Sequence, residues 1–500
     1  MISRFIESKY FFQLIIFILI FFYVFELNFY RHWSTIWDQD LILLHNSLLL
    51  NSGIKAEYHD HPGHTQILFI SLWINFLDLI NIIKFSSYND LKNILITEKN
   101  FFELVKFYRF INLFSLILFS YSFYNISKII TKKKLLSYLL TILFITSLPI
   151  LDSISHVRTE LLSAGLIFLS LLFLLKLIDG NELKRKNIFF CGLAFILSIF
   201  CKFQSIFILL LFPLCFFFIQ KKKIKMNLNF YENKNIHIYL SYLYLFGIFL
   251  IWLKYVKGLN YFIFPVIAIY FYLFINYLKN RFFRQKNFNI IFIHYFLLGS
   301  IISFIILILF KPFHTNNLSM IINFFGASSM FVQGSDLYKF NTHEIIKLIL
   351  ISSKTIFNYL KITFIKNSFT ELLLFCVTSL LVIKNKKLHK DIKNFFKIVI
   401  FLLIVIFLFS VRPKYEYTIY FFPIIYFYFN YIAAFIGNSK ILNTFIILLI
   451  CTNIFSNMNY IKFNKHITAK DKICSDATLN KTNFFIDKMR LDIFTKICKK

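Results

Sequence analysis

The chain has 500 residues, of which 58% are hydrophobic and only 16% charged, and its mean hydropathy is +0.68. Soluble domains carry about 25% charged residues, so this composition excludes an ordinary soluble protein and predicts an all-α polytopic integral membrane protein. The net charge of +31 does not indicate a nucleic-acid partner. The lysines lie at the ends of apolar segments, where the positive-inside rule and anionic lipid headgroups favour them. We therefore expect a multi-pass protein of the cell membrane, most simply the inner membrane of a bacterium.

Basic clusters separate the apolar segments and indicate the cytoplasmic side. The first apolar segment lacks a small-residue cleavage site and is predicted to be a retained helix. Because each crossing needs about 20 apolar residues, we predict about thirteen spans, with the N-terminus in the cytoplasm and the C-terminus outside. The predicted spans are residues 10–29, 108–130, 135–152, 160–178, 188–204, 205–219, 237–253, 260–278, 288–310, 368–384, 395–411, 418–436 and 440–456.

The spans and their loops form one predicted transmembrane domain, residues 1–456. Two large extracytoplasmic loops, 30–107 and 311–367, are expected to carry interfacial helices. Within the first loop, the apolar stretch 66–83 should lie along the outer leaflet instead of crossing it.

A short extracytoplasmic tail, residues 457–500, follows the last span. Its Cys474 and Cys498 would pair if the tail faces an oxidising compartment. Two free thiols fit the sequence equally well.

The polar first part of the outer loop, residues 31–64, gathers acids and histidines in an otherwise apolar chain. Asp38 and Asp40 come directly after the first helix, and residues two apart share a face of an extended backbone. The simpler interpretation makes them solvated carboxylates or helix caps. Several other unusual groups fall on the same side of the membrane, which favours a chemical role.

Three histidines of this loop, His59, His61 and His64, fall within the sequence HDHPGH. Their spacing is a poor match to zinc-binding patterns, so a metal site is the weaker alternative. We expect instead that the Pro-Gly turn presents the imidazoles to an anionic ligand at the start of the interfacial helix.

Short segments at the predicted extracytoplasmic ends of other spans carry charged residues that bilayer insertion does not require. Arg158 and Glu160 lie two residues apart, so on a helix they cannot neutralise each other side by side; Glu160 could instead complement the helix dipole. Burying a lysine such as Lys202 in a membrane helix costs about 2.5–3.5 kcal/mol, which favours a functional role, with snorkelling to the headgroups as the alternative. The segment after the predicted span 395–411 contributes Arg412, Lys414 and Tyr417 to the same side of the membrane.

Carboxylates, cations and imidazoles at one membrane face suit a substrate with an anionic headgroup and an apolar tail. A polyprenyl-phosphate-linked sugar fits that description. A carboxylate would remove the proton of an acceptor hydroxyl, an effect worth roughly 10²–10⁴-fold, and fixed cations would stabilise the departing phosphate. The chain has only 11 Gly and no phosphate-cradling glycine loop, which argues against a nucleotide-sugar donor. We expect neither a metal nor another cofactor.

The order of these motifs resembles that of the GT-C glycosyltransferases, in particular the branch of the protein O-mannosyltransferases and aminoarabinose transferases. The resemblance covers roughly residues 10–220, and the remainder only by topology. The matching motifs are WDQD at 37–40, HDHPGH at 59–64, FYRFINLFSLILFSYSF at 107–123, VRTE at 157–160 and CKFQ at 201–204, with a late echo in RPKYEYTIYFFP at 412–423.

The resemblance implies a GT-C fold and an inverting, metal-independent sugar transfer from a polyprenyl-phosphate donor. The acceptor would be an envelope glycan, lipid or protein on the extracytoplasmic face. The resemblance makes Asp38 or Asp40 the general base and Glu160 a second catalytic carboxylate. It makes His61 a contact on the headgroup side and Lys202 a ligand of the donor phosphate. Beside these, we expect Arg158, Arg412 and Lys414 to bind the donor phosphate, and His59, His64 and Tyr417 to be possible substrate contacts.

The chain departs from the family pattern at four of these motifs. Asp-Gln-Asp replaces the usual Asp-Glu pair, so the choice between Asp38 and Asp40 stays open. Gly63 replaces a frequent second Pro, Glu160 replaces a common Asp, and Phe203 follows the lysine where relatives have Gly. The rival interpretation is a transporter or flippase of lipid-linked saccharides. A transporter should place ionisable residues near the bilayer midplane along an internal repeat, whereas these residues gather at one face.

Overall fold

In the computed structural model, the described residues are 9–36, 39–54, 63–93, 98–179, 184–202, 271–280, 288–309, 369–384, 418–435 and 439–465, with isolated positions that include Ser205, Cys474 and Cys498. Helices and their short connections make up all of these ranges, and no strand occurs in them. The described chain is therefore all-α, as predicted. The spans predicted at 237–253 and 395–411, and the outer loop 311–367 except for Lys361, lie outside the described residues.

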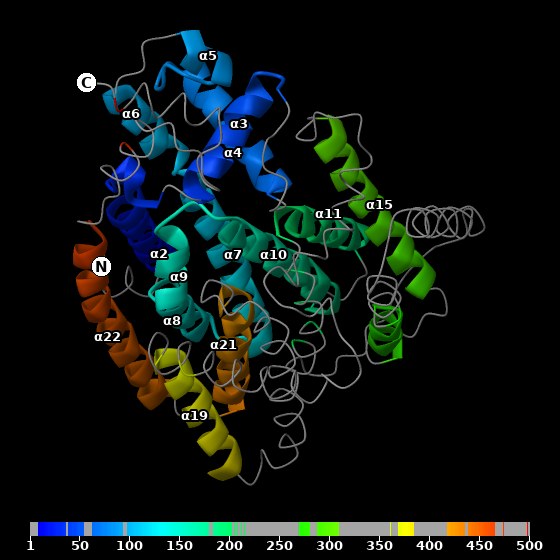
Figure 1. Cartoon of the computed structure of the whole chain (residues 1–500). Coiled ribbons are helices and arrows are strands. Elements are labelled where there is room, and N and C mark those ends of the chain that lie inside the picture. Colours follow the sequence, from blue (N-terminus) through cyan, green and yellow to red (C-terminus); the bar gives the residue numbers. More distant parts are fainter. Residues whose placement is uncertain are drawn as a thin grey trace, which may run out of the picture.

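Most of the helices form a bundle around one large apolar core (Figure 1). Their sequences are rich in Phe, Leu and Ile, so each helix can bury one face against its neighbours and expose another to lipid. The bundle consists of α2 (Lys9–Val24) with one π-helical turn, η1 (Phe25–Phe29), α7 (Ile111–Thr131), α8 (Lys134–Ile145), α9 (Leu148–Ile154), α10 (Thr159–Asp179), α11 (Arg185–Cys201), α15 (Phe288–Leu309), α19 (Phe369–Lys384), α21 (Thr418–Phe435) and α22 (Ser439–Lys465).

Four described segments are long and apolar enough to cross a bilayer: Phe11–Phe29, Thr159–Ile178, Phe288–Leu307 and Lys440–Lys462. A fifth crossing results if α8 and α9, which are bent by 55° at a short break, form one span. All four segments overlap predicted spans, and they support a membrane protein. The total of about thirteen spans and the GT-C arrangement stay predictions.

The helix predicted at 135–152 is divided in two. Ser147 has an extended backbone (φ −72°, ψ 145°), and Pro149 lies in the first turn of α9. Proline has no N–H with which to continue a helix, and it fits well in a first turn. The hydroxyls of Thr146 and Ser147 donate to carbonyl oxygens in the last turn of α8 at 3.0 and 2.6 Å. Continuous hydropathy across residues 135–152 concealed this break.

The first outer loop folds into a cap at one end of the bundle (Figure 1). The cap has its own apolar core, which also includes Val157 from the loop between α9 and α10. Trp73 Nε1 donates to Phe107 O at 2.9 Å and so joins two of the cap helices. The cap elements are η2 (Trp33–Ile36), α3 (Gln39–Asn51), α4 (His64–Leu79), α5 (Tyr88–Asn93) and α6 (Glu98–Tyr108).

Helix α4 has an exposed apolar face opposite the face that it buries in the cap and bundle. Phe69, Leu72 and Phe76 are between 40% and 48% exposed, and Leu79 is 79% exposed. Their spacing places them along one side of the helix, and a continuous apolar face of this kind is suited to contact with lipid or a partner. The placement of the stretch 66–83 along the outer leaflet stays a prediction.

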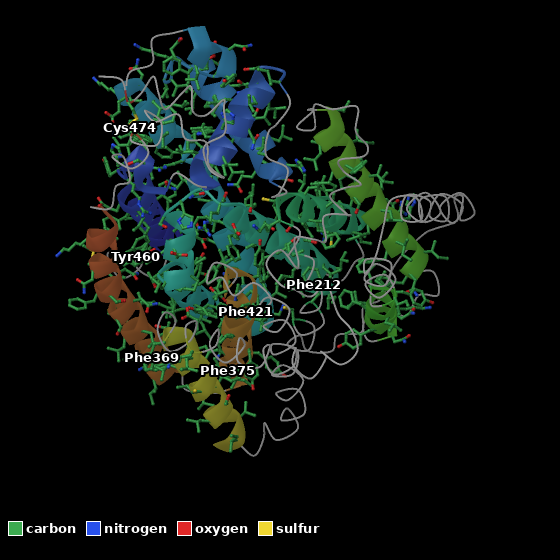
Figure 2. All side chains as sticks on the ribbon, in the orientation of Figure 1. Phe212, Phe369, Phe375, Phe421, Tyr460 and Cys474 are labelled. Atoms are coloured by element: carbon green, nitrogen blue, oxygen red, sulfur yellow. A yellow bond between two sulfur atoms is a disulfide. The ribbon has the colours of Figure 1, made fainter. Side chains whose placement is uncertain are left out.

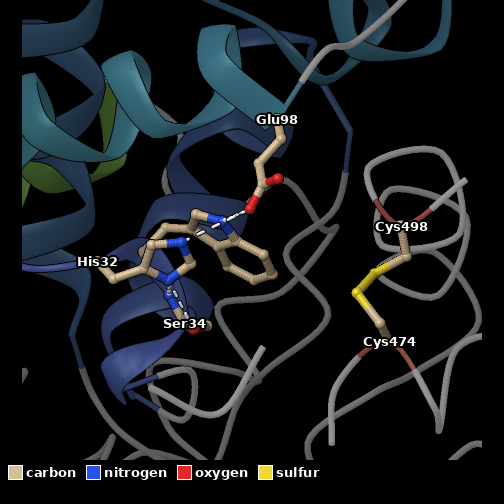
Figure 3. Close-up of a disulfide and its surroundings, with 6 residues drawn as sticks. His32, Ser34, Glu98, Cys474 and Cys498 are labelled. Carbon is tan, nitrogen blue, oxygen red and sulfur yellow. Dashed lines mark hydrogen bonds and ion pairs between the residues drawn. A yellow bond between two sulfur atoms is a disulfide. The ribbon is translucent and has the colours of Figure 1, made fainter. Parts of the chain in front are cut away.

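Cys474 and Cys498 form a disulfide at the cap end of the molecule, near His32 and Glu98 (Figures 2 and 3). The structure thereby selects pairing over the two free thiols that the sequence left equally open. Disulfides persist in oxidising compartments; the extracytoplasmic placement of the tail stays a prediction.

Polar side chains also join helices inside the bundle. Tyr460 of α22, labelled in Figure 2, donates to Asp152 Oδ1 of α9 at 3.0 Å. Tyr426 of α21 donates to Glu371 Oε1 of α19 at 2.7 Å. Interhelical hydrogen bonds in membrane proteins contribute on average about 0.6 kcal/mol each, so they specify helix neighbours more than they stabilise the fold.

Helices α11 and α15 cross at two glycines. A side chain at Gly192 would overlap the carbonyl oxygen of Phe296, and one at Gly299 would overlap that of Phe189. At the same crossing, Ser303 donates to a carbonyl oxygen of α11 at 2.9 Å. Small residues at membrane helix crossings allow such close backbone contact.

We predict that Gly192→Leu and Gly299→Leu each destabilise the protein by about 3 kcal/mol, the upper end of the overpacking range. The obstructing atoms belong to backbone and cannot rotate away. Equilibrium unfolding in mixed micelles measures the change. Leu309→Ala on the lipid-exposed end of α15, where the side chain is 70% exposed, is the control and should change stability little. Equal stability of the glycine variants and this control would contradict the close crossing.

Candidate functional site

Two predicted motifs, HDHPGH through Gly63 and VRTE through Thr159, meet where the cap joins the bundle, and helix α3 packs on the same point. A side chain at Gly63 would lie 2.9 Å from Leu43 Cδ2 and 3.2 Å from Thr159 Cγ2. Thr159 begins α10, and Leu43 lies on α3 about one turn after Asp40. The missing side chain therefore lets α3, the residue before α4 and the start of α10 approach one another.

Glu160 and Lys202 form a buried ion pair next to this junction. Lys202 Nζ lies 3.0 Å from Glu160 Oε1, and each side chain is only 3% exposed. Glu160 is the second residue of α10 and Lys202 directly follows α11, so the pair bridges the adjacent ends of two helices that pack against each other. The sequence placed both residues in one site, and the structure brings them into contact.

Hydrogen bonds connect these helix ends to the start of α4. Cys201 Sγ donates to Thr159 O at 3.2 Å and lies 3.7 Å from Gln66 Oε1. Thr65 Oγ1 donates to a carbonyl oxygen of α11 at 2.8 Å. The first turn of α4 is thus fixed beside the ion pair.

Two buried arginines and an asparagine hold the loop that precedes Glu160. Arg31 Nη1 donates to Ser155 O at 2.8 Å, and Arg109 Nη1 donates to Arg31 O and Asn28 O at 2.7 and 3.2 Å. Asn112 Nδ2 donates to two carbonyl oxygens of the same loop, at 3.0 Å each. The end of the first helix and the start of α7 therefore position this loop through its backbone.

His156 lies in this loop and is only 5% exposed. Burial, followed by the positive charges of Arg158 and Arg31, holds the pKa of His156 well below its usual value near 6.5. Nδ1 shares a hydrogen bond with Ser155 Oγ at 2.6 Å. Nε2 has no hydrogen-bond partner in the described part of the chain. The site therefore contains a neutral imidazole.

Among the predicted site residues, Glu160, Lys202, Arg158 and His64 are described. Glu160 and Lys202 are in contact, and Arg158 is close enough to His156 to affect its pKa. His64 begins α4, and its ring centre lies 6.5 Å from that of Phe200, two residues before Lys202. These four residues belong to one region.

The backbone of Asp40 is the second residue of α3, but its side chain lies outside what the structure describes. The remaining predicted residues also fall outside the described ranges: Asp38, His59, His61, Arg412, Lys414 and Tyr417. Their roles stay predictions.

Some residues of this region were not singled out from the sequence. Arg109 entered only as part of the FYRF motif, and Gln66 only as the first residue of an apolar stretch. Both are buried, with exposures of 1% and 0%. The signal in each case was one polar residue at the start of a long apolar run, a position where polarity is costly unless it is used.

No family model, curated protein or solved structure matches the chain. Within the described residues, no group of three or more His, Cys, Asp or Glu side chains is placed to hold a metal ion. The function must therefore be argued from the chemistry of the residues themselves.

We predict that Lys202→Met destabilises the protein by about 3–5 kcal/mol, because it leaves Glu160 buried without its counter-ion. Combining Lys202→Met with Glu160→Leu removes both charges and should recover most of that loss, as measured by equilibrium unfolding in mixed micelles. The control is Glu98→Gln in the part-exposed His32–Glu98 contact, which should cost at most about 1 kcal/mol. A double variant no more stable than Lys202→Met would show that the pair is not mutually compensating.

We also predict that acid destabilises the protein through His156. Its pKa is lower in the folded than in the unfolded state, so the unfolded state takes up the proton first. Stability should be complete above about pH 6.5 and should fall below it by up to about 1.4 kcal/mol per pH unit. Thermal unfolding measured from about pH 7.5 to pH 5 should show a flatter profile for His156→Gln. An unchanged profile would assign the acid sensitivity to other groups.

Proposed function

We propose that the chain is a membrane glycosyltransferase that moves a sugar from a polyprenyl-phosphate donor to an acceptor hydroxyl on the extracytoplasmic face. The acceptor is an envelope glycan, lipid or protein. The observation that carries the proposal is the buried Glu160–Lys202 pair, next to the point where α3, Gly63 and the start of α10 meet. This junction combines fixed charge with an apolar surrounding, as a lipid-linked phosphate requires.

Lys202 and Arg158 supply the positive charge for the donor phosphate. Charges act more strongly in the apolar interior than in water because the effective dielectric constant is lower. Cations that are already in place stabilise the negative charge that develops on the leaving phosphate without reorganising. The prenyl tail would stay in lipid alongside the exposed apolar faces of the helices.

The transfer itself needs a base. Asp38 or Asp40 would take the proton of the acceptor hydroxyl while the hydroxyl oxygen forms a bond to the anomeric carbon. The bond from that carbon to the phosphate oxygen breaks, and its electron pair stays on the phosphate. The products are an inverted glycoside and polyprenyl phosphate, and the protonated carboxyl later returns its proton to water. Asp40 suits this role because its helix contacts Gly63 one turn later, through Leu43.

Glu160 receives a different role in this proposal from the one expected of it. Its carboxylate contacts Lys202, and it therefore orients the ammonium group toward the phosphate. Glu160 is then a positioning residue, and the role of base belongs to Asp38 or Asp40.

A transporter of lipid-linked saccharides remains the rival. Glu371, buried in the bundle with Tyr426 as its hydrogen-bond donor, is the kind of residue that a transport path would use. The described ionisable residues near the cap junction are more numerous and belong to different segments, namely Arg31, Arg109, Arg158, Glu160 and Lys202. This concentration at one end favours the enzyme.

We predict that one of Asp38→Asn and Asp40→Asn lowers sugar transfer by roughly 10²–10⁴-fold, the usual contribution of a general base. Membranes containing the full chain are supplied with radiolabelled polyprenyl-phosphate hexose, pentose or N-acetylhexosamine, and label in the acceptor fraction is counted. Glu98→Gln serves as the control and should transfer like the unaltered protein. Full transfer by both aspartate variants would refute the assignment of the base.

The same label separates the enzyme from the transporter. In sealed vesicles a transporter would move the labelled lipid across the membrane with its sugar–phosphate bond intact. A glycosyltransferase would release polyprenyl phosphate, and Lys202→Ala should lower its turnover or raise the donor concentration that it needs. Movement of the label without bond cleavage would favour the rival.

A further inference from the structure

Three uncharged polar side chains next to the ion pair are buried with an unused hydrogen-bonding atom. Gln66 and Ser205 are 0% exposed and His156 is 5% exposed. Gln66 Nε2, Ser205 Oγ and His156 Nε2 have no hydrogen-bond partner in the described structure. Native proteins leave few buried polar atoms unsatisfied, and a bound water or ligand is the usual explanation.

Each of the three groups is linked to the ion pair from a different element. Gln66 in the first turn of α4 contacts Cys201, which immediately precedes Lys202. The backbone N–H of Ser205 donates to Lys202 O at 3.1 Å. His156, in the loop before α10, is close enough to Glu160 for that charge to affect its pKa. Three segments that are distant in sequence therefore each supply a residue that is linked to the ion pair and carries an unsatisfied polar atom.

Buried polar atoms without a hydrogen-bond partner also occur elsewhere in the described structure. Ser120 on α7 and Asn453 on α22 are also buried with an atom that lacks a partner, and neither contacts the ion pair in the described structure. The convergence on Lys202 and Glu160 distinguishes Gln66, His156 and Ser205 from them.

We propose that Gln66, His156 and Ser205 form a subsite that binds the hydroxyl groups of the transferred sugar. This inference rests on the proposed function and extends it from the phosphate to the sugar. It would divide the site into a charged part, Lys202 and Arg158, and an uncharged part.

The chemistry of the three side chains favours hydroxyl groups over phosphate oxygens. A carboxamide offers N–H donors and a carbonyl acceptor, a serine hydroxyl donates and accepts, and a neutral imidazole has one donor and one acceptor nitrogen. A sugar hydroxyl likewise donates and accepts, so it can satisfy any of them. An ionised phosphate only accepts, and proteins usually bind it with Arg, Lys or backbone N–H groups. The low pKa of His156 supports the uncharged character of this subsite.

The test compares lipid phosphates with and without a sugar. The full chain in lipid nanodiscs is titrated with undecaprenyl phosphate and with undecaprenyl phosphate that carries a hexose, a pentose or an N-acetylhexosamine. The dissociation constant of each is measured for the unaltered protein, Gln66→Met and Ser205→Ala. Ser120→Ala is the matched control, because it removes a buried hydroxyl that has no partner and does not contact the ion pair in the described structure.

We expect at least one sugar-bearing lipid to bind the unaltered protein more tightly than bare undecaprenyl phosphate does. Gln66→Met and Ser205→Ala should each reduce that advantage by a factor on the order of ten, the loss of one hydrogen bond. Their affinity for bare undecaprenyl phosphate should not change. Ser120→Ala should keep the full advantage. Folding is monitored in the same samples, since Gln66→Met also removes an unsatisfied group and should unfold at an equal or higher temperature.

The other outcomes overturn the subsite, and they separate its failure from that of the proposed function. If both variants keep the preference for the sugar-bearing lipid, or if the unaltered protein shows no such preference, the sugar subsite is wrong while a lipid-phosphate site stands. If the unaltered protein binds none of the four lipids, the donor class is wrong and the proposed function fails with it.

Discussion

A charge buried in an apolar interior must have a fixed partner, because desolvation otherwise costs more than the fold can supply. Glu160 and Lys202 meet this requirement at the adjacent ends of α10 and α11. If either residue moved away, the other would be left as a buried charge without a counter-ion. The pair therefore fixes the adjacent ends of the two helices relative to each other. The turn at Gly63 packs on Thr159, the residue before Glu160. The cap is therefore placed by the same junction.

The same constraint applies to backbone groups, which also need partners where water is excluded. The loop between α9 and α10, residues 155–158, is irregular and mostly buried. Side chains of Arg31 and Asn112 bind carbonyl oxygens of this loop and of the last residue of α9, and Arg109 holds the backbone of Arg31 in turn. The 55° bend between α8 and α9 changes the direction of the chain before it enters this loop. A site can then form inside the protein, beneath the cap.

The helices were predictable from the sequence because hydropathy depends on composition along the chain, and α10, α15 and α19 fall close to their predicted ranges. The junction was predictable only in part. Lys202 and Glu160 stood out because charge is rare in such segments, but their contact depends on how α10 and α11 pack, which no local pattern encodes. The bend at Pro149 was missed, since one proline does not alter mean hydropathy. Gln66 was missed for a related reason: a single amide in an apolar stretch does not change the character of the stretch.

The charged residues of the site were found from the sequence and the neutral ones were missed for one physical reason. Charged residues are conspicuous in a membrane protein sequence because their burial is so costly, so sequence analysis finds the part of a site that handles charge. Neutral polar residues are cheaper to bury and therefore common, as the serines and threonines with backbone acceptors in these helices show. The role of such a residue depends on whether its hydrogen-bonding atoms are used within the protein and on what lies beside it. Gln66, His156 and Ser205 each keep an unused atom and are linked to the ion pair, and both properties become visible only when the helices are packed.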